Sequence, residues 1–172
     1  HPVAAIKSTI EVDFKSLHIL LLYGLEGLDM DDTLQGDDAY TIDIPFENEP
    51  EQARKLGKLL LLISINAKDE KTALQAFRST LVDEGYGGGI TSLKDRDLLP
   101  LINALKDKHP KIAHKFCSNA GINLMNLDAD VASFVLEACL VQDYIPLIMH
   151  DSFIVIDVFE EGLKHIMKAA IA

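Results

Sequence analysis

The chain has 172 residues, of which 48% are hydrophobic, and a formal net charge of −11, so it is long enough for one sizeable core. The acidic balance argues against a surface that coats nucleic acid, because phosphate contacts require Lys and Arg. Apolar runs are far shorter than the roughly 18 residues of a membrane span, so we expect no membrane partner. The sequence opens on His1-Pro2 rather than Met, which predicts a piece of something longer.

The amino-terminal part predicts a strand, a helix and a long loop. Residues 8–14 alternate between apolar and polar side chains and include β-branched residues, a pattern typical of a strand. Ser16 then predicts the cap of a helix over residues 17–25. Residues 26–47 are acidic and interrupted by Gly and Pro, which predicts a solvated excursion.

The rest of the chain predicts mainly helices and one hairpin. Helices are expected over residues 51–67, 69–83, 94–108, 110–117, 127–143 and 160–170. The glycine-rich residues 85–89 lack the Lys-Ser/Thr of a phosphate-binding loop and predict a flexible connector. Residues 146–158 predict a β-hairpin, since two short apolar runs flank a polar tip. We therefore expect an α+β fold, a small antiparallel sheet covered by helices, in a single domain over residues 1–172.

Two aspartates stand at the ends of the predicted strands. Asp13 closes the first strand, and Asp151 lies at the tip of the hairpin. Burying a carboxylate is costly unless it is paired or binds a metal. Two aspartates on neighbouring strands are also what a two-metal phosphoryl-transfer site needs. The alternative is that each is an ordinary turn residue, with Ser152 completing the hairpin turn.

Arg54 and Lys58 form a candidate phosphate-binding pair. They are four residues apart in the predicted helix over 51–67 and therefore lie on one helical face. Two cations on one face can bind a triphosphate, Arg as a fork and Lys as a point charge. The alternative is a solvated basic face, with Arg54 paired to Glu51 at the surface.

In chain order, Asp13-Phe14, Arg54-x-x-x-Lys58 and His150-Asp151-Ser152 resemble three motifs of one polymerase core. They are similar to motifs A, B and C of the palm and fingers of family A DNA polymerases and single-subunit, phage-type RNA polymerases. The resemblance spans residue 8 to about 170. It implies a palm-like fold in which residues 51–117 form a reduced fingers-like helical segment.

The resemblance also implies roles for the motif residues. Asp13, Asp151 and the backbone carbonyl of Phe14 would bind two Mg²⁺ or Mn²⁺ ions, which activate a primer hydroxyl and stabilise the leaving pyrophosphate. Lys58 would contact the incoming triphosphate and protonate the leaving group, assisted by Arg54. The implied activity is template-dependent nucleotidyl transfer, with primer–template and nucleoside triphosphates as partners.

Three further positions bear on the choice of substrate. His150 would lie near the primer terminus. His18 stands where the DNA enzymes place a Glu that screens out the ribose 2′-hydroxyl, and Asn66 stands where both families place a Tyr that helps to select the sugar. Ser152 is the residue of the RNA enzymes at its position. The template and the sugar of the product therefore stay open.

Fewer residues bear on the cellular compartment and on the alternative functions. Cys117 and Cys139 have neither a metal-type spacing nor a disulfide framework, which favours reduced thiols in the cytoplasm. A phage or another mobile element would fit the resemblance, as would assembly with the rest of a longer polymerase. One alternative is an inactive, palm-derived scaffold or binding module of a replication protein. Another is a metal-dependent phosphoesterase that uses Asp13, Asp151 and His150.

Overall fold

The computed structural model describes residues 8–86, 89 and 92–171, and these fall into two compact units. The first, here called the sheet unit, comprises the described residues up to Gly24 and from Leu124 onward. The second, the helical unit, comprises residues 25–123 and is inserted in sequence between the two parts of the first. The expected fingers-like segment falls within the helical unit, and the single-domain organisation stays a prediction.

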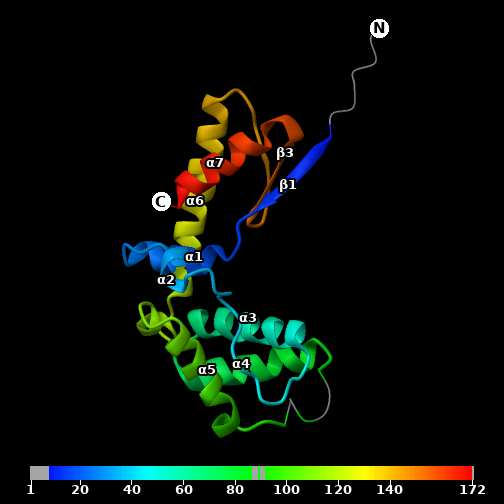
Figure 1. Ribbon diagram of the computed structural model, residues 1–172, viewed down its shortest axis with the longest axis vertical. Coiled ribbons are helices and arrows are strands. Elements are labelled where there is room, and N and C mark those ends of the chain that lie inside the picture. Colours follow the sequence, from blue (N-terminus) through cyan, green and yellow to red (C-terminus); the bar gives the residue numbers. More distant parts are fainter. Residues whose placement is uncertain (1–7, 87–88, 90–91, 172) are drawn as a thin grey trace. The chain divides into compact units, whose positions relative to one another are not determined.

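Three short strands form the antiparallel sheet of the sheet unit (Figure 1). They are β1 (Thr9–Asp13), β2 (Leu147–Met149) and β3 (Ser152–Ile156), in the order β1-β3-β2. A two-residue loop joins β2 to β3, and Met149 pairs with Ser152 across it. The predicted strand, the predicted hairpin and the α+β class are thus confirmed.

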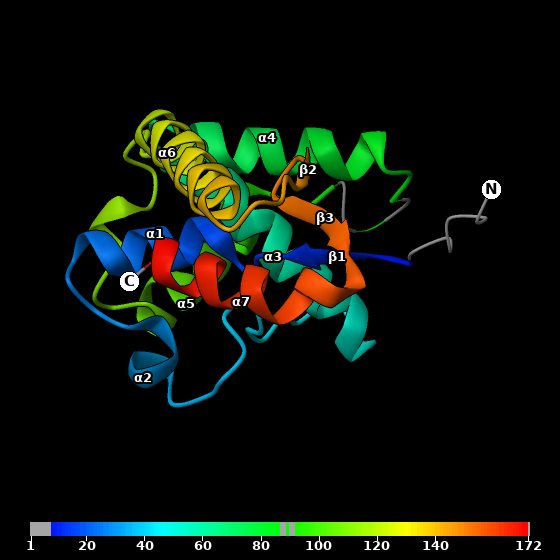
Figure 2. The same ribbon diagram turned by 90° about the horizontal axis from the view of Figure 1, so that it is seen from above.

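One face of the sheet is covered by the last helix. Phe153 and Val155 on β3 are buried, and α7 (Glu160–Ala170) packs against β1 and β3 (Figure 2). Phe14, directly after β1, presents its ring edge to Phe153 with 6.1 Å between the centroids. Because burying one such side chain contributes about 1.5–3 kcal/mol, burial of this apolar face stabilises the sheet.

The sheet unit also contains most of α1 (Leu17–Leu25), most of α6 (Gly121–Val141) and the 3-10 turn η2 (Asp157–Phe159). The helix predicted over 17–25 is confirmed. The prediction that α6 begins at 127 is wrong, because it begins at Gly121. Gly and Asn in this stretch have low helix propensity, but a Cβ at Gly121 would overlap the Asn66 side chain, so close packing selects glycine here.

The helical unit is built on three helices that pack against one another, α3 (Pro50–Asn66), α4 (Glu70–Asp83) and α5 (Asp95–Lys108). Each buries one apolar stripe, as the 3.6-residue period predicts. The stripes consist of Leu56, Leu60, Leu61 and Ile65, then Ala73, Leu74, Phe77 and Leu81, then Leu98, Leu101, Ile102 and Leu105. Of the helices that the structure describes, none combines the length and apolarity needed to cross a membrane.

The helix predicted over residues 110–117 is wrong, because only the 3-10 turn η1 (Ala113–Lys115) forms there. The backbone that follows is used to cap α3 instead. The N–H groups of Cys117, Asn119 and Ala120 donate to the carbonyls of Ser64, Ala67 and Ile65 respectively. These long-range hydrogen bonds satisfy carbonyl groups at the end of α3. No local pattern in the sequence predicts them.

The expectation of a solvated excursion over residues 26–47 holds only in part, since most of these residues are exposed or half-buried but the segment is ordered. It contains a short helix, α2 (Met30–Leu34), and Ala39, Tyr40 and Ile44 are buried. Four consecutive residues, here called the 37–40 segment, are each anchored to α3 or to the end of α5. The anchors are an ion pair of Asp37 with Lys108, an ion pair of Asp38 with Arg54, a hydrogen-bond contact of the Ala39 carbonyl with His109, and close packing of the Tyr40 carbonyl on Gly57.

The predicted connector over residues 85–89 lies partly outside the described residues, since 87 and 88 are not among them. Gly85, which follows α4, has a φ of +80°. Glycine adopts this left-handed conformation without the Cβ clash of other residues, so it suits the end of a helix.

Gly57→Ala tests the close approach of the 37–40 segment to α3. An alanine Cβ would overlap the Tyr40 carbonyl oxygen, so we expect the free energy of unfolding to fall by about 1–3 kcal/mol. Gly24→Ala in α1 is the matched control, because no atom lies within 4 Å of its Cβ position, and it should gain up to about 1 kcal/mol. Urea unfolding measures both, and stabilisation by Gly57→Ala would contradict the packing described.

His109 predicts a pH dependence of stability. Its ring is fully buried with Nε2 2.8 Å from the Ala39 carbonyl oxygen, and burial lowers the pKa of His109 below its ordinary value near 6.5. The unfolded chain therefore takes up a proton first, so stability should fall as the pH drops from about 6.5 through the lower folded pKa.

Urea unfolding between pH 7.5 and 5.5 measures this loss. His109→Gln keeps a donor for the Ala39 carbonyl and removes the titration, so its stability should vary less over that range. An equally steep decline in this variant would assign the effect to other groups.

Candidate functional site

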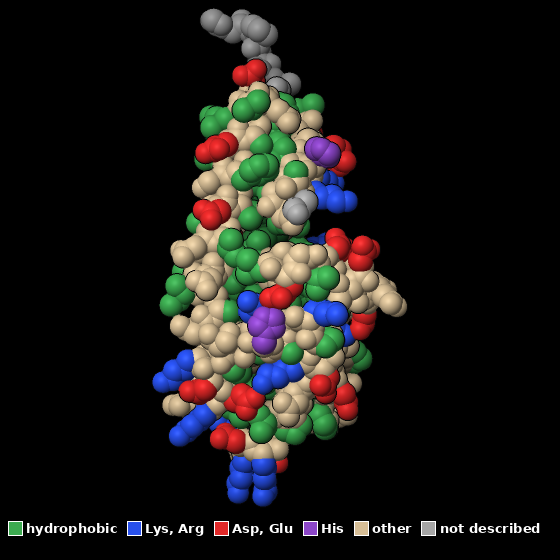
Figure 3. Space-filling view, turned by 90° about the vertical axis from the view of Figure 1, so that its left-hand side faces the viewer, with side chains coloured by type: hydrophobic (Ala, Val, Ile, Leu, Met, Phe, Trp, Pro, Cys, Tyr) green, Lys and Arg blue, Asp and Glu red, His purple; other side chains and the backbone are tan. Residues whose placement is uncertain are grey.

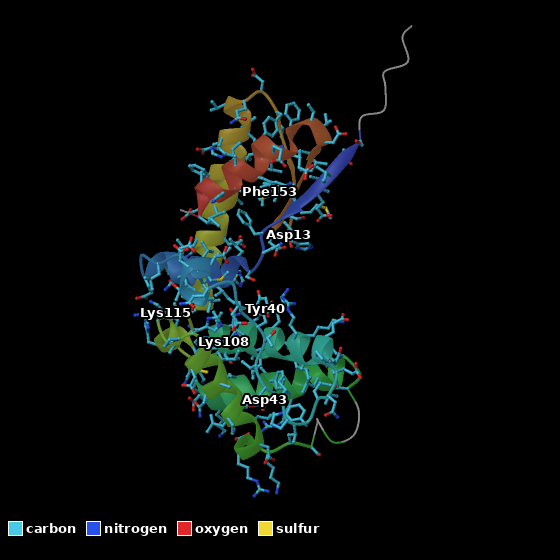
Figure 4. All side chains as sticks on the ribbon, in the orientation of Figure 1. Asp13, Tyr40, Asp43, Lys108, Lys115 and Phe153 are labelled. Carbon is cyan, nitrogen blue, oxygen red and sulfur yellow. The ribbon has the colours of Figure 1, made fainter. Side chains whose placement is uncertain are left out.

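The pairing of β1 with β3 brings Asp13 and Asp151 to the same end of the sheet. Asp13 is the register partner of Ser152, the residue after Asp151. The Phe14 N–H donates to the Asp151 carbonyl oxygen at 3.4 Å, which continues the pairing past the strand ends. Figure 4 shows Asp13 at the end of β1 and Phe153 on the neighbouring strand. Two residues far apart in sequence are thus neighbours, as the sequence predicts.

Asp13 projects from the face of the sheet opposite to the buried phenylalanines. Side chains alternate along a strand, so Asp13 and Glu11 share one face, and the register adds Ser152 to it. Asp13 and Glu11 are exposed, whereas Phe14 on the other side is buried. Asp151 is exposed in the hairpin loop. The aspartates are therefore accessible to a ligand without the full cost of a buried charge.

Glu11 is a second carboxylate on the face that carries Asp13, and the sequence motifs gave it no role. The buried Ser152 hydroxyl oxygen lies 2.5 Å from Glu11 Oε1 and 2.9 Å from the Met149 carbonyl oxygen. Its one proton can be donated to only one of these acceptors at a time. The signal that was available is the two-residue spacing of Glu11 and Asp13, which places both on one face of a strand.

Strained backbone flanks both aspartates. Ser16, which follows Asp13 by one short turn, has a φ of +63°, and His150, directly before Asp151, has a φ of +56°. This left-handed region costs residues with a Cβ roughly 1–2 kcal/mol. Ser16 is therefore not the extended helix cap that its residue type predicts, although its carbonyl accepts from the Ile19 and Leu20 N–H groups. Strain of this kind concentrates at functional sites.

Arg54 and Lys58 lie together on α3 in the helical unit, and both are exposed. Arg54 is held by Asp38: its Nε and Nη2 lie 2.9 Å and 2.7 Å from the Asp38 Oδ2 atom. It is therefore paired with Asp38 and not with Glu51, which forms an ion pair with Lys55 instead.

The pairing also affects the ionisation of Asp38. Burial disfavours its charge, but hydrogen bonds from Arg54 and from the Tyr40 N–H outweigh burial and lower the pKa of Asp38. This carboxylate is therefore charged at neutral pH and neutralises the guanidinium beside it.

Lys58 lies against an aromatic ring. Its Nζ is 5.5 Å from the centre of the buried Tyr40 ring, and the Arg54 guanidinium carbon is 5.2 Å from the same centre. Both distances are within the range of a cation–π interaction. Among the residues that the structure describes, no carboxylate lies within ion-pair distance of Lys58.

The two positions implied in substrate selection lie in different units. Asn66 is exposed at the end of α3 in the helical unit, and its Nδ2 donates to the Leu62 carbonyl oxygen at 2.8 Å. It also lines an apolar cavity of about 330 Å³ between the end of α3 and α4. His18 is half-buried in the first turn of α1 in the sheet unit.

The donors at the end of the sheet are of the type that Mg²⁺ prefers. Carboxylate and carbonyl oxygens are its usual protein ligands, and Asp13, Asp151 and the Phe14 carbonyl would supply them. Within the described ranges, no group of three or more His, Cys, Asp or Glu side chains converges as a metal-binding cluster. The candidate ligand set is therefore two side chains and one backbone group.

Comparisons with known proteins add no relative to this picture. Models of protein families, curated proteins and solved structures were compared with the chain, and none matches it. The case for a function therefore rests on the residues and their arrangement.

Ser16→Gly tests the strain beside Asp13. Glycine adopts a positive φ without penalty, so we expect the free energy of unfolding to rise by about 0.5–1 kcal/mol. Lys15→Gly is the matched control, because Lys15 does not have a positive φ. This variant should be less stable, since glycine relieves no strain there and only increases the conformational freedom of the unfolded chain. Urea unfolding of both variants measures the difference. A loss of stability in Ser16→Gly would mean that the strain at this position is negligible.

Proposed function

We propose that the protein is a template-dependent nucleotidyltransferase of the polymerase type, acting on a nucleic-acid primer–template with nucleoside triphosphates. The observation that supports this most is the adjacency of Asp13, at the end of β1, and Asp151, in the hairpin loop directly before β3. Residues that match two separated motifs of one enzyme core thus meet where that chemistry would need them.

The sheet end would work through its acidic groups. Asp13, Asp151 and the Phe14 carbonyl would hold two divalent cations. Such cations, when bound, lower the pKa of an attacking hydroxyl and neutralise charge on the transferred phosphate. The chain's own contribution would be to hold one carboxylate at the end of β1 and the other in the adjoining hairpin loop, so that little reorganisation is needed during reaction. His150, in the same loop as Asp151, would lie near the primer terminus.

The cations of α3 supply a second part of the proposal. Lys58, with Arg54, would bind the triphosphate and donate a proton to the leaving pyrophosphate. His18 and Asn66 would contact the nucleotide at the positions that select the sugar. The residues of α3 belong to the helical unit and the carboxylates to the sheet unit, so each part can be tested separately.

The charge of the chain constrains where nucleic acid could bind. On the face shown in Figure 3, Lys and Arg side chains are interspersed with Asp and Glu side chains. With a net charge of −11, binding would depend on a few local cations and on divalent ions, so we expect it to weaken only modestly with monovalent salt, because few phosphate contacts release few counterions.

Glu11 favours one second candidate, a metal-dependent phosphoesterase. Such sites often recruit additional carboxylates, and Glu11 lies on the same face as Asp13. The two reactions differ in their products. Nucleotidyl transfer lengthens a primer and releases pyrophosphate, whereas hydrolysis shortens a polynucleotide or releases phosphate without extension.

Asp13→Asn and Asp151→Asn test the proposal. Each removes a charge that would hold a divalent cation, so we expect primer extension to fall at least about 10³-fold. The measurement is extension of a labelled primer with Mg²⁺ or Mn²⁺ and either ribo- or deoxynucleotides.

Asp143→Asn is the matched control, since Asp143 is exposed and its φ of +60° is tolerated by Asn. It changes the net charge equally and should leave extension intact. Extension at the unaltered rate in either test variant would exclude the assignment, and phosphate release without extension would favour the phosphoesterase. A matched titration with Mn²⁺, followed by electron paramagnetic resonance, should show weaker binding in both test variants.

A further inference from the structure

The 37–40 segment contacts the two cations of α3 in different ways. Asp38 forms an ion pair with Arg54, whereas Lys58 has only the Tyr40 ring among the contacts described above. An Arg whose fork is occupied by a carboxylate has fewer donors to offer a phosphate. A Lys over an aromatic face keeps its three donors available, because the ring contributes electrostatic attraction without accepting a conventional hydrogen bond.

The 37–40 segment has several contacts that hold the Tyr40 residue in place next to Lys58. Tyr40 is buried, and its carbonyl lies so close to Gly57 that no side chain fits between them. On one side the Ala39 carbonyl contacts the buried His109, and on the other the Asp38 Oδ1 atom accepts from the N–H groups of Tyr40 and Thr41 at 3.0 Å. The backbone that carries the buried Tyr40 ring is thus fixed from both sides.

We propose that Asp38 and Tyr40 are positioning residues for phosphate binding on α3: Asp38 occupies Arg54, and the Tyr40 ring seats Lys58, so that Lys58 makes the phosphate contact. This inference rests on the proposed function for the identity of the ligand, a triphosphate. It refines that function, since the two cations no longer share one role. Arg54 ties the 37–40 segment to α3, and Lys58 faces the ligand.

Inorganic tripolyphosphate is the probe, because it carries the charge of the ligand without a base or a sugar. Its binding to the full chain is followed by ³¹P NMR without divalent cations. Lys58→Gln should weaken binding by roughly ten-fold, the value of a charge-assisted contact. Arg54→Gln should weaken it less than about two-fold. Lys55→Gln is the matched control, since Lys55 is exposed on the same helix and pairs with Glu51, and it should change nothing.

Tyr40 and Asp38 supply the readouts that a merely structural role would not move. Tyr40→Leu should weaken tripolyphosphate binding by about five-fold. Tyr40→Phe should bind tripolyphosphate as the unaltered protein does, since the ring and not the hydroxyl attracts the cation. The ring-current shift of the Lys58 methylene protons should disappear in Tyr40→Leu and remain in Tyr40→Phe.

Asp38→Asn gives a result of opposite sign. The amide oxygen can still accept from the N–H groups of Tyr40 and Thr41, but Arg54 is released, so tripolyphosphate should bind about two- to five-fold more tightly. Arg54, Lys58 and Asp38 are not fully buried, so these variants remain informative even if Tyr40→Leu does not fold.

Equal losses in Arg54→Gln and Lys58→Gln, or weaker binding by Asp38→Asn, would overturn the proposal. Loss of tripolyphosphate binding in Tyr40→Phe would overturn it as well. Failure of the proposed function looks different. In that case primer extension is absent under all conditions, while the dependence of tripolyphosphate binding on Lys58 and Tyr40 persists.

Discussion

The pairing of β1 with β3 is the constraint on which the sheet unit depends. It joins residues from opposite ends of the chain, so forming it carries a large loop-closure cost that local structure cannot offset. Burial of Phe153 and Phe14 on one face supplies the compensation. The same register fixes which face carries Asp13, because a slip by one residue would turn Asp13 inward and Phe14 outward. Stability and the placement of the carboxylate thus follow from one alternation.

In the helical unit, helix packing and a short irregular segment together position the candidate binding residues. Its three helices pack through apolar stripes, but the surface of α3 is organised by a short irregular segment. Charged, aromatic and backbone groups of residues 37–40 are all used, each against a different partner. Gly57 on α3 leaves room for the backbone of this segment, and the buried His109 after α5 contacts its Ala39 carbonyl. Such positions are sensitive to substitution although they lie outside any regular element.

The sequence predicts the elements whose signal is periodic. The alternation around Asp13 and the apolar runs beside Asp151 predicted the strands, and their likeness to polymerase motifs predicted that the two aspartates would be neighbours. The tie between Asp38 and Arg54 could not be predicted, because the acidic, glycine-broken stretch around Asp38 has no period and is ordered by distant partners. The replacement of the predicted helix over 110–117 by the 3-10 turn η1 could not be predicted for the same reason. The backbone N–H groups that follow η1 donate to carbonyls at the end of α3, which is distant in sequence.

The insertion of one unit within the other has a consequence for biosynthesis. Residues 25–123 form a continuous stretch, so the helical unit can fold as soon as it leaves the ribosome. β1 is made before the helical unit and its partner β3 after it, so β1 has no partner strand while the residues between them are made. The nascent chain must therefore keep this strand from pairing elsewhere until β3 has been made. Its alternating acidic residues, Glu11 and Asp13, provide the charge repulsion that discourages association with another copy.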